Sequence, residues 1–270
     1  MANISRGSIV DIRAAHPAPD WATVTPHPRP HVMVIQHEDG CPLGLFDGWL
    51  RAAGARITVV RPYAGDPLPA GGSGSADGLI VLGGSMSATD DDRCPWLPAT
   101  RELLRAAVGE GLPTLGICLG LQLLTVACGG RVEPNPAGKQ MGVVPVGYTA
   151  SAGTERLFGA SARQGGVGAV HWNDDIAVTL PAAATLVATA PGGVPQVIRV
   201  GEAAWGVQFH PEADERIVTD WARSEGPVTP VEQAALAGIA AAAADLAAAW
   251  RPVAIRFAEI AAERRTATGP

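Results

Sequence analysis

The chain of 270 residues is long enough to bury a large core, and with 47% hydrophobic and 17% charged residues it has the composition of a folded protein rather than a disordered one. Its 20 lysines and arginines against 26 aspartates and glutamates give a formal net charge of −6. This balance offers no basic surface for a nucleic-acid backbone, so we exclude nucleic acid as an expected direct partner.

The cysteines and the apolar segments indicate a soluble, cytoplasmic protein with no membrane partner. The four cysteines, Cys41, Cys94, Cys118 and Cys128, are scattered and form neither a disulfide framework nor a zinc-binding pattern. Residues 1–30 are rich in proline and lack the apolar core of a signal peptide, so we expect a loosely ordered arm there. The alanine-rich stretch 234–249 is interrupted by Asp245, which makes it a poor membrane span.

Short apolar runs alternate with helical stretches from about residue 31, which is the pattern of a parallel sheet with crossover helices. In chain order the predicted strands of the first half are 31–36, 56–60, 78–82 and 112–117. The predicted helices are 43–53, 98–108 and 119–127. The fourth strand runs directly into Cys118.

The second half predicts shorter strands, followed by a long helix. The strands are expected at 142–146, 185–188, 196–200 and 204–209. Thr229 as N-cap, Pro230 at the first helical position and Glu232 three residues after the cap predict a capping box and then an alanine-rich helix. Pro252 is expected to break or kink this helix and to leave 253–265 as a last amphipathic segment.

These patterns divide the chain into three parts. We expect an N-terminal arm over residues 1–30, an α/β domain over 31–228 and a C-terminal helical extension over 229–270. In an α/β domain of this kind the active site is expected at the carboxyl ends of the strands.

A cysteine between two glycines, in the sequence GICLGLQLL, lies at the junction of the fourth strand and the following helix. Gly116 and Gly120 allow a sharp, strained turn around Cys118, and the helix N-terminus behind the sulfur favours the thiolate. This is the pattern of a nucleophile elbow. Most cysteines are buried packing residues, which is how we interpret Cys41 and Cys128, but the flanking glycines favour a nucleophile at Cys118.

A base for this thiol is predicted in the sequence GVQFHPE, where a strand ends in His-Pro-Glu. With Pro211 between them, His210 can reach the sulfur while Glu212 fixes the tautomer of its ring, which is the arrangement of a nucleophilic triad. A histidine at a strand end is more often structural. The coexistence of His210 with the cysteine elbow makes it a catalytic candidate.

The sequences GICLGLQLL and GVQFHPE resemble the two signature blocks of the class I, triad-type glutamine amidotransferases. The region 81–97, with VLGGSMS and then DDRCPWL, resembles the oxyanion-strand region of free-standing members related to the glutaminase half of GMP synthase. The resemblance covers about residues 32–212. It implies a flavodoxin-like α/β fold with a mostly parallel central sheet flanked by helices, to which this chain adds its C-terminal helical extension.

The resemblance also implies the catalytic roles. Cys118 would be the nucleophile, His210 the general base and then the general acid, and Glu212 the residue that orients His210. The backbone N–H groups of Gly84 and Leu119 would form the oxyanion hole, which typically contributes a few kcal/mol of transition-state stabilisation.

Three further residues are implied as substrate contacts. Gln122 matches the family glutamine that contacts the substrate amino acid, and it lies on the same helix face as the cysteine. Trp172 and Asn173 fall where the free-standing relatives carry a His-Trp-His-Gly-Asp-like stretch that grips the glutamine main chain. Because Asn173-Asp174 replaces the His-Gly pair of that stretch, the identity of the γ-glutamyl substrate stays open.

The expected reaction is hydrolysis of the side-chain amide of L-glutamine through a γ-glutamyl thioester, which requires no metal or organic cofactor. Asp90, Asp91 and Asp92 have no histidine or spaced fourth ligand beside them, so we expect a solvated loop and no metal site. Many relatives carry an acidic residue at the place of Gln140, to which we assign no catalytic role.

Three functions of the protein remain open. Because no SGGxDS-type ATP-pyrophosphatase motif is present, ammonia is expected to serve a separate synthetase or acceptor. The chain could instead hydrolyse another γ-glutamyl amide or peptide. A non-catalytic interaction module on the same scaffold is the third possibility, which the intact Cys118, His210 and Glu212 disfavour.

Overall fold

The computed structural model describes residues 29–69, 72 and 74–268. Apart from its last two residues, the arm predicted over 1–30 therefore lies outside the described residues. From Pro30 onward the chain enters directly into the central sheet.

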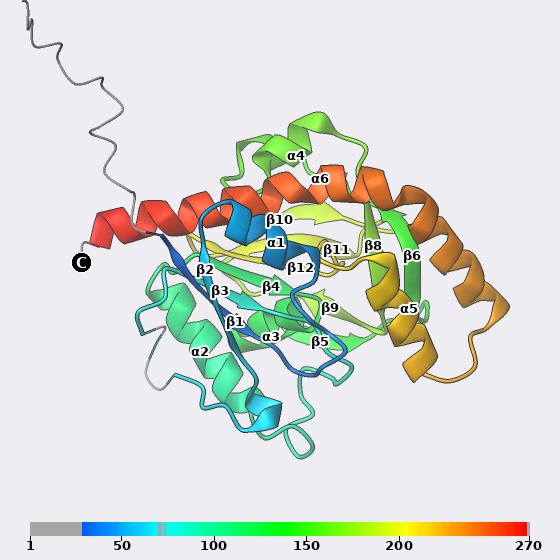
Figure 1. Cartoon of the computed structure of the whole chain (residues 1–270), viewed down its shortest axis with the longest axis horizontal. Coiled ribbons are helices and arrows are strands. Elements are labelled where there is room, and N and C mark those ends of the chain that lie inside the picture. The colour runs from blue at the N-terminus through cyan, green and yellow to red at the C-terminus, as the bar shows by residue number, and fades with distance from the viewer. Residues whose placement is uncertain (1–28, 70–71, 73, 269–270) are drawn as a thin grey trace, which may run out of the picture.

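A mixed sheet forms the centre of the fold, with the strand order β2-β1-β3-β4-β12-β11-β10-β7 (Figure 1). The parallel strands are β1 (His31–Ile35), β2 (Arg56–Val60), β3 (Gly78–Val81), β4 (Thr114–Ile117) and β12 (Ala204–Val207). The strands β11 (Pro195–Val200), β10 (Ala184–Thr189) and β7 (Gly147–Tyr148) continue the sheet through antiparallel pairs. The predicted mostly parallel α/β sheet is thus confirmed.

Helices cover both faces of this sheet because successive strand residues point to opposite sides. Val32 and Val34 of β1 pack in the cluster that includes α1 (Leu45–Ala52) and α6 (Pro230–Thr268). Met33 and Ile35 pack in the cluster that includes α2 (Leu97–Gly109) and α3 (Leu119–Ala127). Figure 1 shows α1 and α6 on one side of the sheet and α2 and α3 on the other.

Smaller elements complete the fold. Two short antiparallel pairs join β5 (Arg131–Pro134) to β9 (Asp175–Thr179) and β6 (Gln140–Pro145) to β8 (Gly168–Asn173). The remaining helices are α4 (Gly159–Gln164), α5 (Glu215–Ser224) and the short 3₁₀ helices η2 (Pro62–Ala64) and η3 (Ala152–Thr154). Every strand and helix predicted up to residue 209 is present, with ends shifted by at most two residues. The sequence did not predict α4, α5, β5, β7, β8 or β9.

The helix α6 begins as predicted but is not broken by proline. The Thr229 N–H donates to Glu232 Oε2 at 2.7 Å and the Glu232 N–H donates to Thr229 Oγ1 at 3.3 Å, which confirms the capping box. Of the break or kink predicted at Pro252, the break is wrong, because α6 runs through this residue as one helix of 39 residues. Trp250 and Val253, on either side, are buried in the core, and their packing outweighs the one backbone hydrogen bond that proline removes.

By length and composition alone, residues Pro230–Ala267 of α6 are also apolar enough to cross a membrane, contrary to the expectation from Asp245. Core helices of soluble proteins meet the same criterion. In this fold only 17% of the apolar window of α6 is buried, whereas Phe257 and Ile260, in the C-terminal part of the helix, are fully buried in the cluster that includes α1. The helix therefore contributes to the packing of one sheet face.

Candidate active site

Cys118 lies in a strained turn between β4 and α3. Its φ of 51° makes it the only non-glycine residue in the described ranges with a positive φ. Its N–H donates to the Val207 carbonyl at 2.8 Å, which ties the turn to β12. The strain resides in the cysteine itself, as expected for a nucleophile elbow.

The two glycines around Cys118 are required for space rather than for their own φ. A Cβ on Gly120 would lie 2.0 Å from the Val81 carbonyl oxygen, and a Cβ on Gly116 would lie 2.4 Å from the Gly120 oxygen. The sequence predicted glycines here because of the sharp turn. The structure shows instead that they let β3, β4 and the start of α3 approach closely.

His210 and Glu212 follow β12 and form a buried pair beside Cys118. The His210 Nδ1 and the Glu212 Oε1 atoms are 2.8 Å apart, and both side chains are almost inaccessible to solvent. Burial alone would lower the pKa of His210, but the Glu212 carboxylate and the hydrogen-bonded Cys118 sulfur outweigh it and raise that pKa to about 10. A base held in this way has its second ring nitrogen directed to the sulfur.

The backbone around this pair is fixed from two sides. The His210 N–H donates to the Val170 carbonyl of β8 at 2.7 Å. The Glu212 carbonyl accepts the Leu45 N–H at 2.9 Å, where α1 begins. Gly44 has a φ of 54°, and a Cβ there would lie 2.2 Å from the same Glu212 oxygen, so only glycine fits this contact.

The two predicted oxyanion residues lie together at the elbow. Leu119 is the first residue of α3, so its N–H has no acceptor within the helix. A Cβ on Gly84 would lie 2.9 Å from the Leu119 side chain, and one on Gly83 would lie 3.0 Å from the His210 ring. The loop after β3 therefore closes over Cys118 and brings two backbone segments to the same place.

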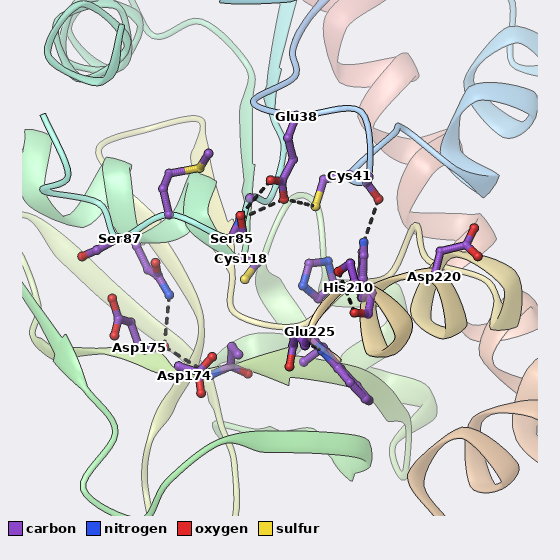
Figure 2. A pocket seen from close by; sticks show the side chains of 18 residues that line it. Glu38, Cys41, Ser85, Ser87, Cys118, Asp174, Asp175, His210, Asp220 and Glu225 are labelled. Atoms are coloured by element: carbon purple, nitrogen blue, oxygen red, sulfur yellow. Dashed lines mark hydrogen bonds between the residues drawn. The ribbon is translucent and has the colours of Figure 1, made fainter. Parts of the chain in front are cut away.

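A cavity of about 580 Å³ opens over Cys118 and His210. Figure 2 shows Cys118 and His210 near its centre, with Glu38 on one side of them and Asp175 on the other. The three predicted substrate contacts, Gln122, Trp172 and Asn173, all line this cavity. The structure thus brings together every residue that the sequence assigned to the site.

The amide groups of Gln122 and Asn173 shape the wall of the cavity. Their side-chain nitrogens donate to the Asp175 carbonyl, at 3.0 Å from Gln122 and 3.2 Å from Asn173. Asn173 Oδ1 lies 3.3 Å from the buried His171 Nδ1, and its amide nitrogen lies 3.4 Å from Gln140 Oε1. Gln140 therefore supports Asn173 from behind and is not among the residues that line the cavity.

Glu38 and Cys41, which follow β1, form a part of the wall that the sequence missed. Glu38 accepts the Ser85 N–H at 2.9 Å, the Ser85 hydroxyl at 2.8 Å and the Cys41 thiol at 3.1 Å. The interpretation of Cys41 as a packing residue is therefore incomplete. Burial and the Glu38 carboxylate raise the pKa of Cys41 well above its ordinary value, so it stays a thiol. The position of Glu38 at the carboxyl end of β1 was the one available signal.

The helix α5 forms the wall beside His210 and was also missed. The ring of Trp221 lies 4.5 Å from that of His210, and its indole N–H donates to the Gly40 carbonyl at 2.7 Å. The Asp214 side chain caps the helix by accepting the Ile217 N–H at 2.9 Å. An N-cap aspartate followed by apolar residues at helical spacing was a signal that could have predicted α5.

The cavity wall is strongly acidic. Its carboxylates come from Glu38, Asp174, Asp175, Asp220 and Glu225, and among the described residues that line it there is no lysine or arginine. Lys139 lies just outside, 4.7 Å from the centre of the Trp172 ring, and forms an ion pair with Glu225. Within the described ranges no group of three histidines, cysteines or carboxylates could hold a metal ion. Asp91, in the predicted solvated loop, pairs with Arg101 at 2.7 Å.

Known proteins are similar to this chain in sequence and in fold. The family description Glutamine amidotransferase class-I matches residues 48–218. A glutamine amidotransferase-like protein of Salmonella typhimurium is 32% identical over 187 residues, which cover 67% of this chain and 75% of that protein. A glutamine-hydrolysing GMP synthase subunit from Halobacterium salinarum is 36% identical over 140 residues, covering 51% of this chain and 67% of that protein.

A hydrolase and a solved structure extend this comparison. The γ-glutamyl-L-1-hydroxyisopropylamide hydrolase of a Pseudomonas species is 27% identical over 187 residues, covering 64% of this chain and 60% of that enzyme. The crystal structure of a glutamine amidotransferase from Methylobacillus flagellatus matches 86% of this chain and 96% of its own, with a TM-score of 0.75 and 26% identity. Sequence and fold therefore point to one family.

Proposed function

Because the chain belongs to the class I glutamine amidotransferases, a family of cysteine-dependent amide hydrolases, we propose that it hydrolyses a γ-glutamyl amide, with L-glutamine as the parent substrate. The observation that supports this proposal best is the strained Cys118 in one cavity with the buried His210–Glu212 pair. A thiol, a base and a residue that orients the base are the three groups that nucleophilic acyl transfer needs.

In the first half of the reaction, Cys118 forms a thioester. Its Sγ gives its proton to His210 before the attack, because the raised pKa keeps the His210 ring protonated, and the sulfur then attacks the amide carbon as a thiolate. The backbone N–H groups of Gly84 and Leu119 then stabilise the negative charge on the carbonyl oxygen. His210 gives its proton to the amide nitrogen, the C–N bond breaks, and ammonia or an amine leaves.

In the second half, water resolves the thioester. His210 removes a proton from the water, which attacks the thioester carbon, and the C–S bond breaks to give glutamate and the free thiol of Cys118. Glu212 keeps a proton on Nδ1 of His210 and stabilises the ring when it is positively charged in both halves. The proposal therefore gives one defined task to each of Cys118, His210 and Glu212.

A larger γ-glutamyl amide is a second candidate substrate, and the size of the cavity favours it. Ligand cavities of roughly 300–1,000 Å³ typically hold drug-sized molecules. The cavity of about 580 Å³ falls within that range, whereas glutamine is much smaller. The similarity to a hydrolase named for a substituted γ-glutamyl amide supports the same candidate.

Where glutamine is the substrate, we assign the released ammonia to a separate synthetase. The similarity to one component of a GMP synthase supports this assignment. A chain that works in this way should be slow alone and should be stimulated by a co-purifying protein. Full turnover of glutamine without any partner would contradict it.

The first experiment measures glutamate release from L-glutamine by the wild type and by Cys118→Ala, with Cys128→Ala as the matched control at the far end of the same helix. We expect activity in the wild type and in the control and none in Cys118→Ala. If glutamine is not hydrolysed, labelling of Cys118 by an electrophilic glutamine analogue would still support the nucleophile. If the wild type neither hydrolyses glutamine nor is labelled at Cys118, the proposed chemistry is overturned.

A further inference from the structure

The loop that carries the proposed oxyanion donor of Gly84 is fixed by a backbone N–H at each end. At its start, the Leu82 N–H donates to the Ile35 carbonyl at 3.0 Å, beside the parallel pair of β3 and β1. At its end, the Ser85 N–H donates to the Glu38 carboxylate at 2.9 Å. Both acceptors therefore belong to β1 or to the segment that follows it.

Glu38 uses both of its carboxylate oxygens in these contacts. Its Oε1 accepts the Ser85 N–H and, at 3.1 Å, the Cys41 thiol, while its Oε2 accepts the Ser85 hydroxyl at 2.8 Å. Figure 2 shows this carboxylate joined to Ser85 and Cys41 beside Cys118. Hydrogen bonds to an ionised acceptor are stronger than neutral ones, so the contact holds the peptide group of Ser85 in one orientation.

The backbone of Glu38 is itself anchored to the sheet. Its carbonyl accepts the Gln36 side-chain amide at 2.8 Å and the Cys41 N–H at 3.3 Å. Gln36 is buried, and its own N–H donates to the Val60 carbonyl at the end of β2 at 3.0 Å. The side chain that reaches Ser85 therefore starts from a fixed position.

Gly84 is closely packed between three side chains. A Cβ there would lie 2.5 Å from Met86 Sδ, 2.9 Å from the Leu119 side chain and 3.3 Å from the His37 Cβ. His37 is buried, and its Nδ1 accepts the Trp96 indole N–H at 3.1 Å. Packing therefore fixes where the glycine lies, and the hydrogen bonds at the two ends of the loop fix how its peptide groups are turned.

We propose that Glu38 is a positioning residue for the oxyanion hole, because its bond to the Ser85 N–H keeps the Gly84 N–H directed at the carbonyl oxygen of the substrate. This proposal rests on the proposed function. A carboxylate cannot itself stabilise an oxyanion, since both are negative, so Glu38 contributes geometry and not charge. Oxyanion donors act on the transition state, and loss of their alignment lowers kcat more than it changes KM.

The test compares the wild type and Glu38→Ala in the hydrolysis of L-glutamine and of γ-glutamyl-p-nitroanilide. We expect kcat to fall about tenfold to a hundredfold and KM to change less than about twofold. Glu38→Gln keeps one acceptor oxygen and should recover part of the lost kcat. Ser85→Ala keeps the backbone N–H, so its kcat should stay within about threefold of the wild type. An unchanged kcat in Glu38→Ala, or a loss confined to KM, would overturn the proposal.

Alkylation of Cys118 separates the oxyanion hole from general damage to the elbow. Iodoacetamide reacts at a saturated carbon and loses iodide, so no oxyanion forms and the rate reports the thiolate alone. Mass spectrometry of the peptides counts Cys118 apart from Cys41. We expect equal rates at Cys118 in the wild type and in Glu38→Ala. If alkylation fell as much as hydrolysis, Glu38 would support the thiol, and its assignment to the oxyanion hole would be wrong.

Asp39→Ala is the matched control for Glu38→Ala. Asp39 is the next residue of the same loop, its carboxylate accepts the Tyr63 hydroxyl at 2.5 Å, and it is not among the residues that line the cavity. This change removes an equal charge without touching Ser85, so kcat and KM should stay unchanged. Equal losses in both variants would attribute the effect to the charge of the loop and would overturn the proposal.

The same assays distinguish the failure of this proposal from the failure of the proposed function. If the wild type hydrolyses either substrate, Cys118→Ala does not, and Glu38→Ala is as active as the wild type, the assignment of Glu38 alone is overturned. If the wild type hydrolyses neither substrate, the assignment of Glu38 fails together with the proposed hydrolysis.

Discussion

The nucleophile side of the cavity and its α5 side are built in different ways. Cys118, His210 and Glu212 are all at most 6% exposed, and each is held by backbone hydrogen bonds from neighbouring elements. Asp220 and Glu225 are exposed. Asp220 pairs with Arg216, while Glu225 pairs with Lys139 and accepts the Trp172 indole N–H. The difference teaches that the proposed triad is held by rigid, buried geometry, while the carboxylates of α5 lie at a surface where charges are better tolerated.

The largest effect should come from the buried side. Glu212→Gln keeps the shape of the side chain but removes the charge that stabilises protonated His210, and it allows the wrong ring tautomer. We expect kcat to fall by about a thousandfold to ten-thousandfold, as in other triads that lose this group. Glu215→Gln, an exposed position three residues later, is the control and should keep full activity. A near-normal kcat in Glu212→Gln would show that the reaction does not depend on the buried charge of Glu212.

The elbow itself should be nearly as sensitive. Gly120→Ala would place a Cβ 2.0 Å from the Val81 oxygen, so β3 and α3 must separate. We expect a loss of stability of about 1–3 kcal/mol, because backbone atoms have to move, and a loss of activity of about a hundredfold from the displaced thiol.

Gly48→Ala is the matched control for that change. Gly48 lies within α1 and has no atom within 4 Å of an added Cβ, so alanine there should raise stability by up to about 1 kcal/mol. Chemical denaturation and glutamate release measure both variants. Equal effects at the two glycines would show that the elbow has no special packing requirement.

The sequence predicted the buried side well because its constraints are local. Glycines around a cysteine at a strand end, and His-Pro-Glu at the end of another strand, are short patterns whose geometry follows from the backbone. The alternation of apolar runs likewise predicted the sheet and the helices α1, α2 and α3. In such segments local propensity and tertiary packing favour the same structure.

The α5 side could not be predicted because its residues meet only through the fold. Trp172 of β8 donates to Glu225 at 2.9 Å, although the two lie far apart in the sequence, and Glu38 reaches Ser85 from another strand end. Pro252 is a second case in which the fold decides the local structure. Propensity alone predicted a break or kink there, but burial of its neighbours keeps α6 continuous. These features depend on contacts that no local pattern contains.

The buried His171 of β8 should make the stability of the fold depend on pH. Its His171 is fully buried, and burial lowers the pKa of His171 to about 4, although the contact with Asn173 opposes this. Between pH 6.5 and about 4 the unfolded chain therefore binds a proton that the folded chain does not. The free energy of unfolding should fall as the pH falls through this window, and it should be fully recovered above pH 6.5.

His171→Leu should flatten that dependence by about 1 kcal/mol per pH unit, while His37, whose pKa is also lowered to about 4 by burial, keeps its own contribution. Denaturant unfolding at several pH values measures the slopes. Parallel slopes in the two proteins would show that folding does not lower the pKa of His171.

The smallest predicted effect concerns a buried residue that touches the nucleophile without belonging to the triad. Gln208 is fully buried, and its amide nitrogen lies 3.7 Å from the Cys118 sulfur, while its Oε1 has no partner among the described residues. Because a hydrogen bond to sulfur favours the thiolate, Gln208→Leu should shift the pH profile of Cys118 alkylation upward and lower kcat about tenfold. Stability should stay equal or rise, since an unsatisfied buried atom is removed.

Gln196 is the natural control for this change. It is equally buried, its carbonyl accepts the Gln208 N–H at 2.9 Å, and neither atom of its amide group has a partner in the described part of the chain. Gln196→Leu should therefore stabilise the fold in the same way and leave the alkylation profile of Cys118 unchanged. If both variants shifted that profile equally, the effect would come from the general polarity behind the elbow. If only Gln208→Leu shifted it, the buried side would contain a specific donor that tunes the nucleophile.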